Sequence, residues 1–383
     1  MMIIESKRIG CLDGLRGLAA LWVLLGHSLQ LTGWHLPILS SPDLGVDLFI
    51  MLSGFLMVFH YQLRETANPW EKPSTWFGFW LKRFFRIAPL YYVMLCIALV
   101  LGPQLYESRM VIDTFLARGP QLPERYLDGS LSNLLIHASF LFGLHPAYAF
   151  RTPLPDWSLG LEMQFYAVFP LAMLLLRKAR WLPGAAFIAL AAFLVAKAIQ
   201  ALHVDFPMPS FLPLKMHVFL CGMLIANGLF VSQRQTIMNG LLAVLLVMIP
   251  IGGDMTSTKV AIRVLLVVGF FALVHYHLLP GLIGKIGDRI SSMMGNRFCH
   301  WLGELSFGVY LIHLLLLQPI AAFVIRYFGG DISAPVRFAI VVTALLPVAY
   351  ALAYLGFTRI EGPGQKLGRK VLEKIGRRRL KPA

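Results

Sequence analysis

The sequence has few charged residues and few cysteines, and both shortages restrict the class of protein. Charged residues make up 14% of the 383 positions, whereas a soluble domain carries about 25%. The four cysteines (Cys11, Cys96, Cys221 and Cys299) are scattered without paired spacing, so neither a disulfide framework nor a metal site is indicated. We find no polar stretch long enough for a separate soluble domain, and no internal repeat of the kind typical of inverted-repeat transporters.

Apolar residues are abundant instead. They form 57% of the chain, and the mean hydropathy is +0.69. The apolar runs are about twenty residues long, the length of a membrane-spanning helix, and they lack the alternation of barrel strands. We therefore predict an all-α fold, a polytopic membrane bundle. It forms one integral membrane domain over residues 1–383, of which 366–383 is a basic cytoplasmic tail.

Ten segments are predicted to cross the membrane: 12–31, 44–63, 85–102, 157–176, 182–202, 212–231, 237–251, 260–280, 300–322 and 335–356. A further apolar segment, 131–145, is shorter and contains Asn133 and His137. The net charge of +15 is explained by lysine and arginine in cytoplasmic loops, so we expect no nucleic-acid partner.

The basic residues orient the segments. Lys7 and Arg8 place the N-terminus inside, and the loop 32–43, which has no lysine or arginine, lies outside. Continued alternation gives ten crossings with both termini cytoplasmic. Residues 103–130 and 146–156 must then share the outer face. The segment 131–145 is therefore expected to be re-entrant or to lie on the outer surface.

The first crossing carries three ionisable residues on one stripe. His27 follows Arg16 by eleven residues, which returns it to within about 20° on the helix face, roughly 16 Å further along the axis. Asp13 lies on the same side. Such residues are costly inside a membrane unless they face a polar interior, so a functional site is favoured over a structural ion pair with a satisfied histidine. A histidine suits proton transfer, and a buried arginine suits a phosphate or a polarised carbonyl.

Two carboxylates are predicted at a depth similar to that of His27. Asp47 lies near the outer end of its helix, where we expect it to orient or stabilise the imidazole. Glu162 has no neighbouring cation in sequence and needs a partner from another helix, for which His27 and Arg16 are candidates. The Ser53-Gly54 pair is interpreted as a packing site rather than a nucleophile.

Other polar groups are less specific by themselves. Lys82, Arg83 and Arg86 begin the third crossing and would bind phosphates, although ordinary positive-inside anchoring explains them equally well. Tyr310 and His313 share a face of the ninth crossing. A single histidine in that position is more typical of a hydrogen bond between helices.

Taken together, these segments resemble the acyltransferase-3 family of integral membrane O-acyltransferases. The resemblance lies in ordered blocks over nearly the whole chain. The blocks are Arg16-x10-His27 after Leu12-Asp13-Gly14, Gly45-Val-Asp47-Leu-Phe with Ser53-Gly54-Phe55, Arg83-x-x-Arg86-Ile-x-Pro89, Trp157-Ser158-Leu-x-x-Glu162-x-Gln164-Phe165-Tyr166, Ser306-x-Gly308-x-Tyr310-Leu311-x-His313 and Ile360-Glu361-x-Pro363. Two positions depart from the family pattern: Gly362 replaces a basic residue and Lys82 an arginine.

The resemblance implies transfer of an acyl group, often acetyl, from cytoplasmic acyl-CoA to a hydroxyl of a glycan or glycoside outside the inner membrane. Acyl-CoA is then a co-substrate, and no permanently bound cofactor or metal is expected. The resemblance gives three sets of residues different roles. The catalytic set is His27 as general base, Asp47 or Glu162 orienting it, and Arg16. Acyl-CoA is held by Arg16, Lys82, Arg83 and Arg86. The acceptor is bound by Trp157, Ser158, Tyr310 and His313.

Several alternatives stay open at this point. A covalent acyl-imidazole relay is one alternative to direct transfer. A proton-coupled transporter or flippase for a glycan or lipid would also use intramembrane arginine, histidine and glutamate, although the missing repeats and the family blocks favour an enzyme. The expected partners are acyl-CoA, the acceptor and the bilayer, and the sequence does not indicate an oligomeric state.

Overall fold

The computed structural model describes residues 9–253 and 256–379, and within these ranges it contains helices and no strands. Lys7 and Arg8, on which the orientation partly depends, lie outside the described residues, as does the end of the basic tail. The helices of the first half are α1 (Cys11–Thr32), α2 (Pro42–Gln62), α3 (Pro73–Val100), α4 (Gly102–Phe115), α5 (Glu124–Leu127), α6 (Leu131–Ala138), the 3₁₀ turn η1 (Phe142–Leu144) and α7 (Trp157–Lys178).

The second half continues the bundle. Its elements are α8 (Trp181–Ala201), α9 (Leu212–Asn227), the 3₁₀ turn η2 (Gly228–Phe230), α10 (Gln233–Val247), α11 (Ser257–Val274), the 3₁₀ turn η3 (Tyr276–Leu278), α12 (Gly281–Met294), α13 (Arg297–Phe328), α14 (Ala334–Gly356), the π-helical turn η4 (Phe357–Glu361) and α15 (Gly362–Arg379). This all-α composition is expected in lipid, because a helix satisfies its own backbone hydrogen bonds.

Each of the ten predicted crossings overlaps one helix of the structure. Among the described residues, eight helices are long and apolar enough to span a membrane. The other two predicted crossings are α1, which carries Arg16 and His27, and α10, which has 15 residues. The protein is therefore a polytopic helical bundle, and the count of ten stays a prediction.

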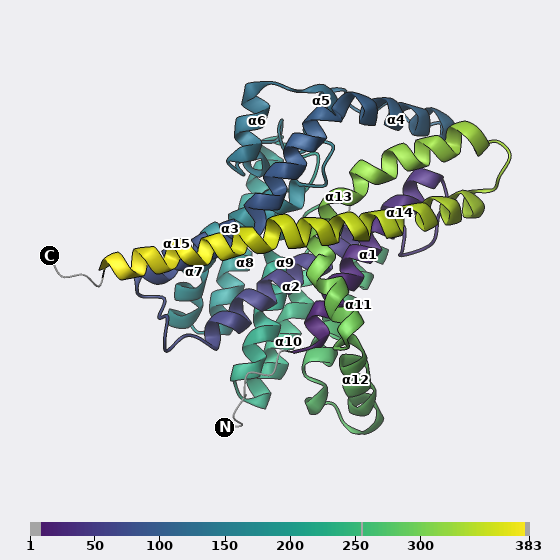
Figure 1. The fold of residues 1–383 in the computed structure, drawn as a ribbon. Helices are drawn as coiled ribbons and strands as arrows, with labels where there is room; N and C mark the ends of the chain where they lie inside the picture. The colour runs from purple at the N-terminus through teal and green to yellow at the C-terminus, as the bar shows by residue number, and fades with distance from the viewer. Residues whose placement is uncertain (1–8, 254–255, 380–383) are drawn as a thin grey trace.

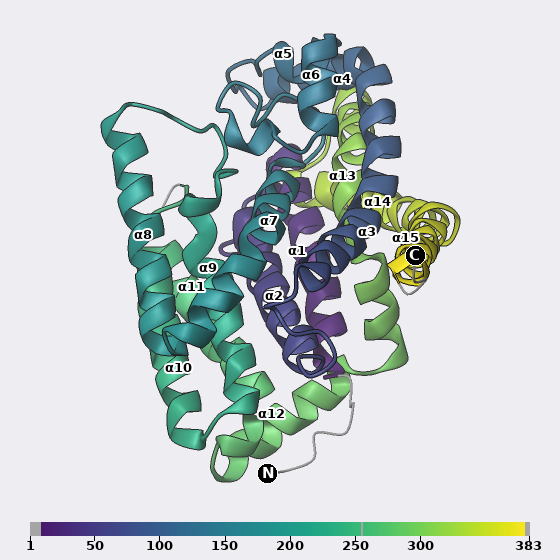
Figure 2. The same cartoon turned by 90° about the vertical axis from the view of Figure 1, so that its left-hand side faces the viewer.

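The segment 131–145 contains no continuous spanning helix, as predicted. It is divided into α6, with eight residues, and the turn η1. Eight helical residues extend only about 12 Å, less than half of the hydrocarbon thickness. Figure 2 shows α4, α5 and α6 together at one end of the bundle, with α12 at the opposite end. We call residues 102–156 the cap.

The membrane helices differ in how much of their surface is buried within the protein. The most apolar windows of α2, α9 and α13 are 78% buried, whereas those of α8 and α11 are only 28% buried and must present the rest of their apolar surface to lipid. The central helices α2 and α9 approach closely at two glycines. A Cβ atom on Gly54 would lie 2.2 Å from the carbonyl oxygen of Phe219, and one on Gly222 would lie 1.8 Å from that of Met51. This confirms Gly54 as a packing residue.

The C-terminal segment continues the bundle as a helix. Figure 1 shows α14 and α15 as one continuous rod, joined through η4. Helix α15 packs against α3, where Gly364 and Gly368 leave room for Pro89 and Phe85. The described part of the basic tail is thus attached to a membrane helix along its first turns.

Candidate active site

A cavity of about 720 Å³ opens at the end of the bundle where α1 and α13 begin. Helices α1, α2, α3, α7, α13 and α15 contribute to its wall. Its lining is rich in cations: Arg16, Arg64, Lys82, Arg83, Arg86 and Arg369. The sequence predicted four of these six. It missed Arg64 and Arg369, because only the tertiary structure brings the end of α2 and helix α15 beside α3.

Few of these cations are neutralised. Arg86 forms an ion pair of 3.4 Å with Glu361, a residue of the π-helical turn η4 that is 1% exposed. The guanidinium of Arg83 lies 5.8 Å from the centre of the Tyr166 ring, and its Nε is enclosed without a hydrogen-bond partner among the described residues. The six basic side chains outnumber the three carboxylates of the lining, Asp13, Glu162 and Glu304, so the cavity has the positive charge expected of a site for a polyanion.

A second, smaller chamber of about 70 Å³ lies next to the cavity. The two spaces share Arg16, Ser53, Glu162 and Phe307. At roughly 10–15 Å³ for one water, the chamber has room for about five to seven water molecules. Its remaining lining is mainly apolar, with two hydroxyl groups: Val46, Phe49, Ile50, Leu52, Ser158, Leu159, Phe219 and Tyr310.

Glu162 lies where the cavity and the chamber meet. It accepts hydrogen bonds from the Ser53 hydroxyl at 2.7 Å and from the Tyr166 hydroxyl. The structure thus gives Glu162 two hydroxyl partners, and its expected contact with His27 is absent among the described residues. Arg16 lines the same two spaces, so the carboxylate and the guanidinium face one passage without a direct ion pair.

Ser158 and Tyr310 are brought together at the chamber wall. The Tyr310 hydroxyl lies 2.7 Å from the carbonyl oxygen of Pro155 and 2.6 Å from the Ser158 hydroxyl. A carbonyl only accepts, so Tyr310 donates to Pro155 and Ser158 donates to Tyr310. Trp157 is buried in the hydrophobic core and lines neither space, so the structure gives it a packing role.

His27 and His313 form a direct pair between α1 and α13. Nε2 of His313 lies 3.1 Å from Nδ1 of His27, and the ring centres are 5.1 Å apart. Neither histidine lines the cavity or the chamber. Tyr310 connects the two regions, because it lines the chamber and its ring centre lies 6.0 Å from that of His313.

The expectation that Asp47 orients His27 is wrong. The Asp47 carboxylate, fully buried, is bound by Lys215 at 2.7 Å and by Arg263 at 2.5 Å. These cations come from α9 and α11, and each is 2% exposed. Arg263 also has an enclosed Nη1 without a partner among the described residues. Asp47 therefore neutralises buried cations that lie far from it in sequence, and sequence reasoning could not identify them.

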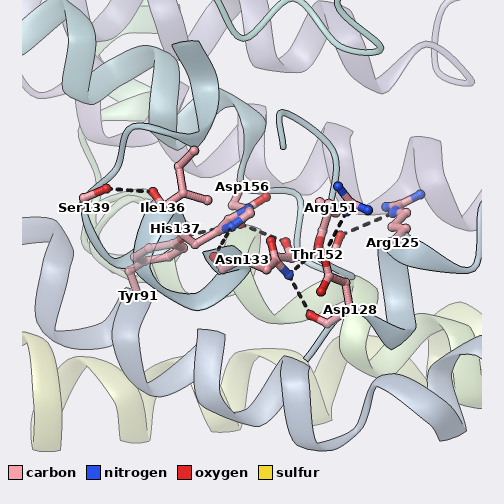
Figure 3. Close-up of polar contacts among 10 residues, drawn as sticks. All are labelled: Tyr91, Arg125, Asp128, Asn133, Ile136, His137, Ser139, Arg151, Thr152 and Asp156. Atoms are coloured by element: carbon pink, nitrogen blue, oxygen red, sulfur yellow. Dashed lines mark hydrogen bonds and ion pairs between the residues drawn. The ribbon is translucent and has the colours of Figure 1, made fainter. Parts of the chain in front are cut away.

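The cap holds the start of α7 through a polar cluster (Figure 3). The Asp156 carboxylate accepts hydrogen bonds from Thr152 at 2.8 Å and from the Tyr91 hydroxyl at 3.2 Å, and it lies 3.9 Å from Nε2 of the fully buried His137. Burial raises the pKa of Asp156, although His137 and the two hydroxyls oppose that shift. Asp156 immediately precedes α7, so this cluster fixes the backbone that carries Ser158.

Further polar contacts connect the segments of the cap to one another. Arg151 forms an ion pair with Asp128 at 2.9 Å, and Asn133 donates to the carbonyl oxygens of Asp128 and Arg151. Arg125 donates to the carbonyl oxygen of Thr152 (Figure 3). Within the described residues no group of three histidine, cysteine, aspartate or glutamate side chains is arranged to hold a metal ion.

The fold and these spaces define a multi-pass membrane protein with a basic cavity that narrows to a small apolar chamber. A model of the acyltransferase-3 family, described as an acyltransferase domain, matches residues 9–354. The chain therefore belongs to the acyltransferase-3 family, as its sequence blocks indicate.

Individual relatives match over about half of the chain. It is 34% identical over 188 residues to a putative membrane-bound transacylase of Komagataeibacter xylinus, covering 48% of this chain and 42% of that protein. It is 31% identical over 180 residues to an acyltransferase of Streptomyces mycarofaciens, covering 45% and 41%, and 25% identical over 182 residues to a peptidoglycan O-acetyltransferase of Listeria monocytogenes, covering 45% and 25%. The matches thus span less than half of these relatives. No solved structure matches the chain.

Proposed function

We propose that the protein transfers a short acyl group, acetyl above all, from cytoplasmic acyl-CoA to a hydroxyl of an extracytoplasmic glycan or glycoside. The observation that supports this most is that the basic cavity and the small chamber are adjacent and share four lining residues. The cavity matches the charge of a nucleotide-bearing donor, and the chamber matches the size of a short acyl group.

The donor enters from the cytoplasm in this proposal. The positive-inside rule places the basic end of the bundle, and with it both termini, on the cytoplasmic side of the inner membrane. The phosphates of CoA would bind Arg83, Arg86 and Lys82, with Arg64 and Arg369 at the same cavity wall. The acyl end would then pass Arg16 and Glu162 into the chamber.

Chemistry takes place in the chamber, between Arg16 and Tyr310, which both line it. Nε2 of His27 takes the proton of the acceptor hydroxyl, and the resulting oxygen nucleophile attacks the thioester carbonyl carbon. The C–S bond breaks, the ester forms, and the CoA thiolate receives the proton from His27. Arg16 stabilises the negative charge that develops on the carbonyl oxygen.

The acceptor reaches His27 from the side of the cap. The Listeria relative is named a peptidoglycan O-acetyltransferase, which supports an envelope glycan as the acceptor class here. We place the glycan between the cap and the α1–α13 pair, next to the Ser158–Tyr310 hydrogen bond.

A reconstituted assay tests this function. Purified protein in nanodiscs is given acetyl-CoA with a radioactive acetyl group, together with glycan fragments from the host envelope, and the labelled ester and free CoA are measured. We expect both products from wild type and neither from His27→Ala. Glycan binding without consumption of acyl-CoA, or proton-driven glycan movement in proteoliposomes, would contradict the proposal and favour a carrier.

A further inference from the structure

The contact between His27 and His313 bears on which ring nitrogen of each histidine carries the hydrogen. Helices α1 and α13 form the most extensive helix contact in the bundle, and this contact brings the two imidazoles together although 286 residues separate them. His313 is 1% exposed, whereas His27 is partly exposed. The ring nitrogens and their acceptors fix where the protons lie.

The proton on His313 is located by a carbonyl group. Nδ1 of His313 lies 2.6 Å from the carbonyl oxygen of Tyr310. A carbonyl oxygen only accepts hydrogen bonds, so Nδ1 must carry the hydrogen. In the neutral ring, Nε2 is then an acceptor. That acceptor faces Nδ1 of His27 at 3.1 Å.

The same reasoning applies to His27. Its Nδ1 lies 3.0 Å from the carbonyl oxygen of Val23 and 3.1 Å from the acceptor Nε2 of His313. Both neighbours accept, so Nδ1 of His27 carries the hydrogen and shares it between them. The lone pair of neutral His27 is then on Nε2. This atom has no hydrogen-bond partner among the described residues and is not among their enclosed polar atoms, so it is free to accept and is not completely covered.

We propose that His313 is a positioning residue that holds His27 in the Nδ1–H tautomer and directs the basic Nε2 toward the acceptor hydroxyl. This inference depends on the proposed role of His27. It changes the role predicted for His313, since both of its ring nitrogens are occupied and neither is free for a substrate. His313 performs here the orienting task that an aspartate performs in a serine-protease triad.

A neutral partner has a chemical consequence. Among the described residues, no carboxylate contacts either ring, so His27 meets only neutral acceptors, the Val23 carbonyl and Nε2 of His313. When Nε2 of His27 receives the proton, Nδ1–H keeps its two acceptors and the ring does not have to turn. The proton can then leave from the same Nε2 to the CoA thiolate.

Two matched substitutions test the role of His313. A glutamine amide oxygen reaches the place of Nε2 and can still accept from His27, whereas an asparagine side chain reaches only the place of Nδ1. We expect His313→Gln to retain kcat within about tenfold. His313→Asn should lose at least about 10²-fold, the lower end of what a general base contributes. The KM for acyl-CoA should stay the same in both variants.

Two outcomes would contradict the proposed role of His313. Equal kcat values for the two variants, both folded and monodisperse in detergent, would overturn the proposal, and so would a His313→Gln protein as inactive as His313→Ala. A purely structural role would lower the thermal stability of both variants without separating their kcat values. If the wild-type protein itself did not turn over acyl-CoA, the proposed function would be rejected instead.

Spectroscopy tests the tautomer without any activity. The protein with ¹⁵N in the rings of its eleven histidines is measured in bilayers, and His27→Gln identifies the signal of His27 by difference. We expect a protonated Nδ1 and an unprotonated Nε2 on His27 in wild type. The opposite tautomer would overturn the proposal. In His313→Asn, a mixture of the two tautomers is expected.

Discussion

Replacing Asp47 by asparagine should destabilise the protein strongly. The carboxylate is fully buried and neutralises Lys215 and Arg263, each 2% exposed. Asparagine keeps the shape but removes the charge, so two cations are left buried without a counterion. Breaking a buried ion pair by removing one partner costs about 3–5 kcal/mol, and here one carboxylate serves two cations. We expect at least the upper end of that range.

A nearby carboxylate provides the matched control. Asp43, one helical turn before Asp47, pairs with Lys259 at 3.0 Å, but it is 37% exposed. Exposed pairs contribute about 0–1 kcal/mol, so Asp43→Asn should have little effect. Unfolding of both variants by denaturing detergent, followed by tryptophan fluorescence, gives the two free energies of unfolding.

A double variant at Asp47 and Lys215 tests the same buried ion cluster. Adding Lys215→Met to Asp47→Asn removes one of the two orphaned cations, so the double variant should recover part of the lost free energy of unfolding. Equal stability of Asp47→Asn and Asp43→Asn would refute the reasoning. Normal stability with abolished turnover in Asp47→Asn would also refute it, and would return Asp47 to the chemistry that the sequence suggested.

Three further predictions concern the site and the topology. Glu162→Gln should lower kcat more than it lowers assembly of the protein in the membrane. Its combination with His27→Ala should be little worse than the worse single variant, because the effects of residues that act as one unit are not additive. Fully additive activation free energies would place Glu162 outside the reaction. Arg83→Ala with Arg86→Ala should raise the KM for acyl-CoA and leave the KM for the acceptor unchanged. The control, Arg177→Ala, removes only the exposed ion pairs with Glu65 and Glu71 and should leave both KM values unchanged. An unaltered KM for acyl-CoA in the double variant would show that Arg83 and Arg86 act only as topology anchors. In a cysteine-free background, Leu122→Cys and Ala147→Cys in the cap should both react with an impermeant maleimide from outside; reaction at only one of them would add a crossing.

Much of the site could be predicted because its components carry their own signal. Arg16 and His27 lie on one helix, so the helical period alone puts them on one face. The sequence correctly shows that Glu162 has no neighbouring cation, but its partners differ from those expected: they are the hydroxyl of Ser53 on α2 and that of Tyr166, one turn further along α7. Arg64 and Arg369 gave no local signal, since an arginine in a basic loop or tail is ordinary.

The sequence by itself determined the class of fold, because apolar runs of membrane length leave the backbone only the helix in which to satisfy its hydrogen bonds. It also determined which residues are too costly to lie in lipid without a function or a partner. Only the tertiary structure decided the partners: Asp47 with Lys215 and Arg263, and His27 with His313. The physical reason is that a carboxylate and an imidazole bind whichever complementary group the packing of distant helices brings within about 3 Å, and sequence distance carries no information about that packing.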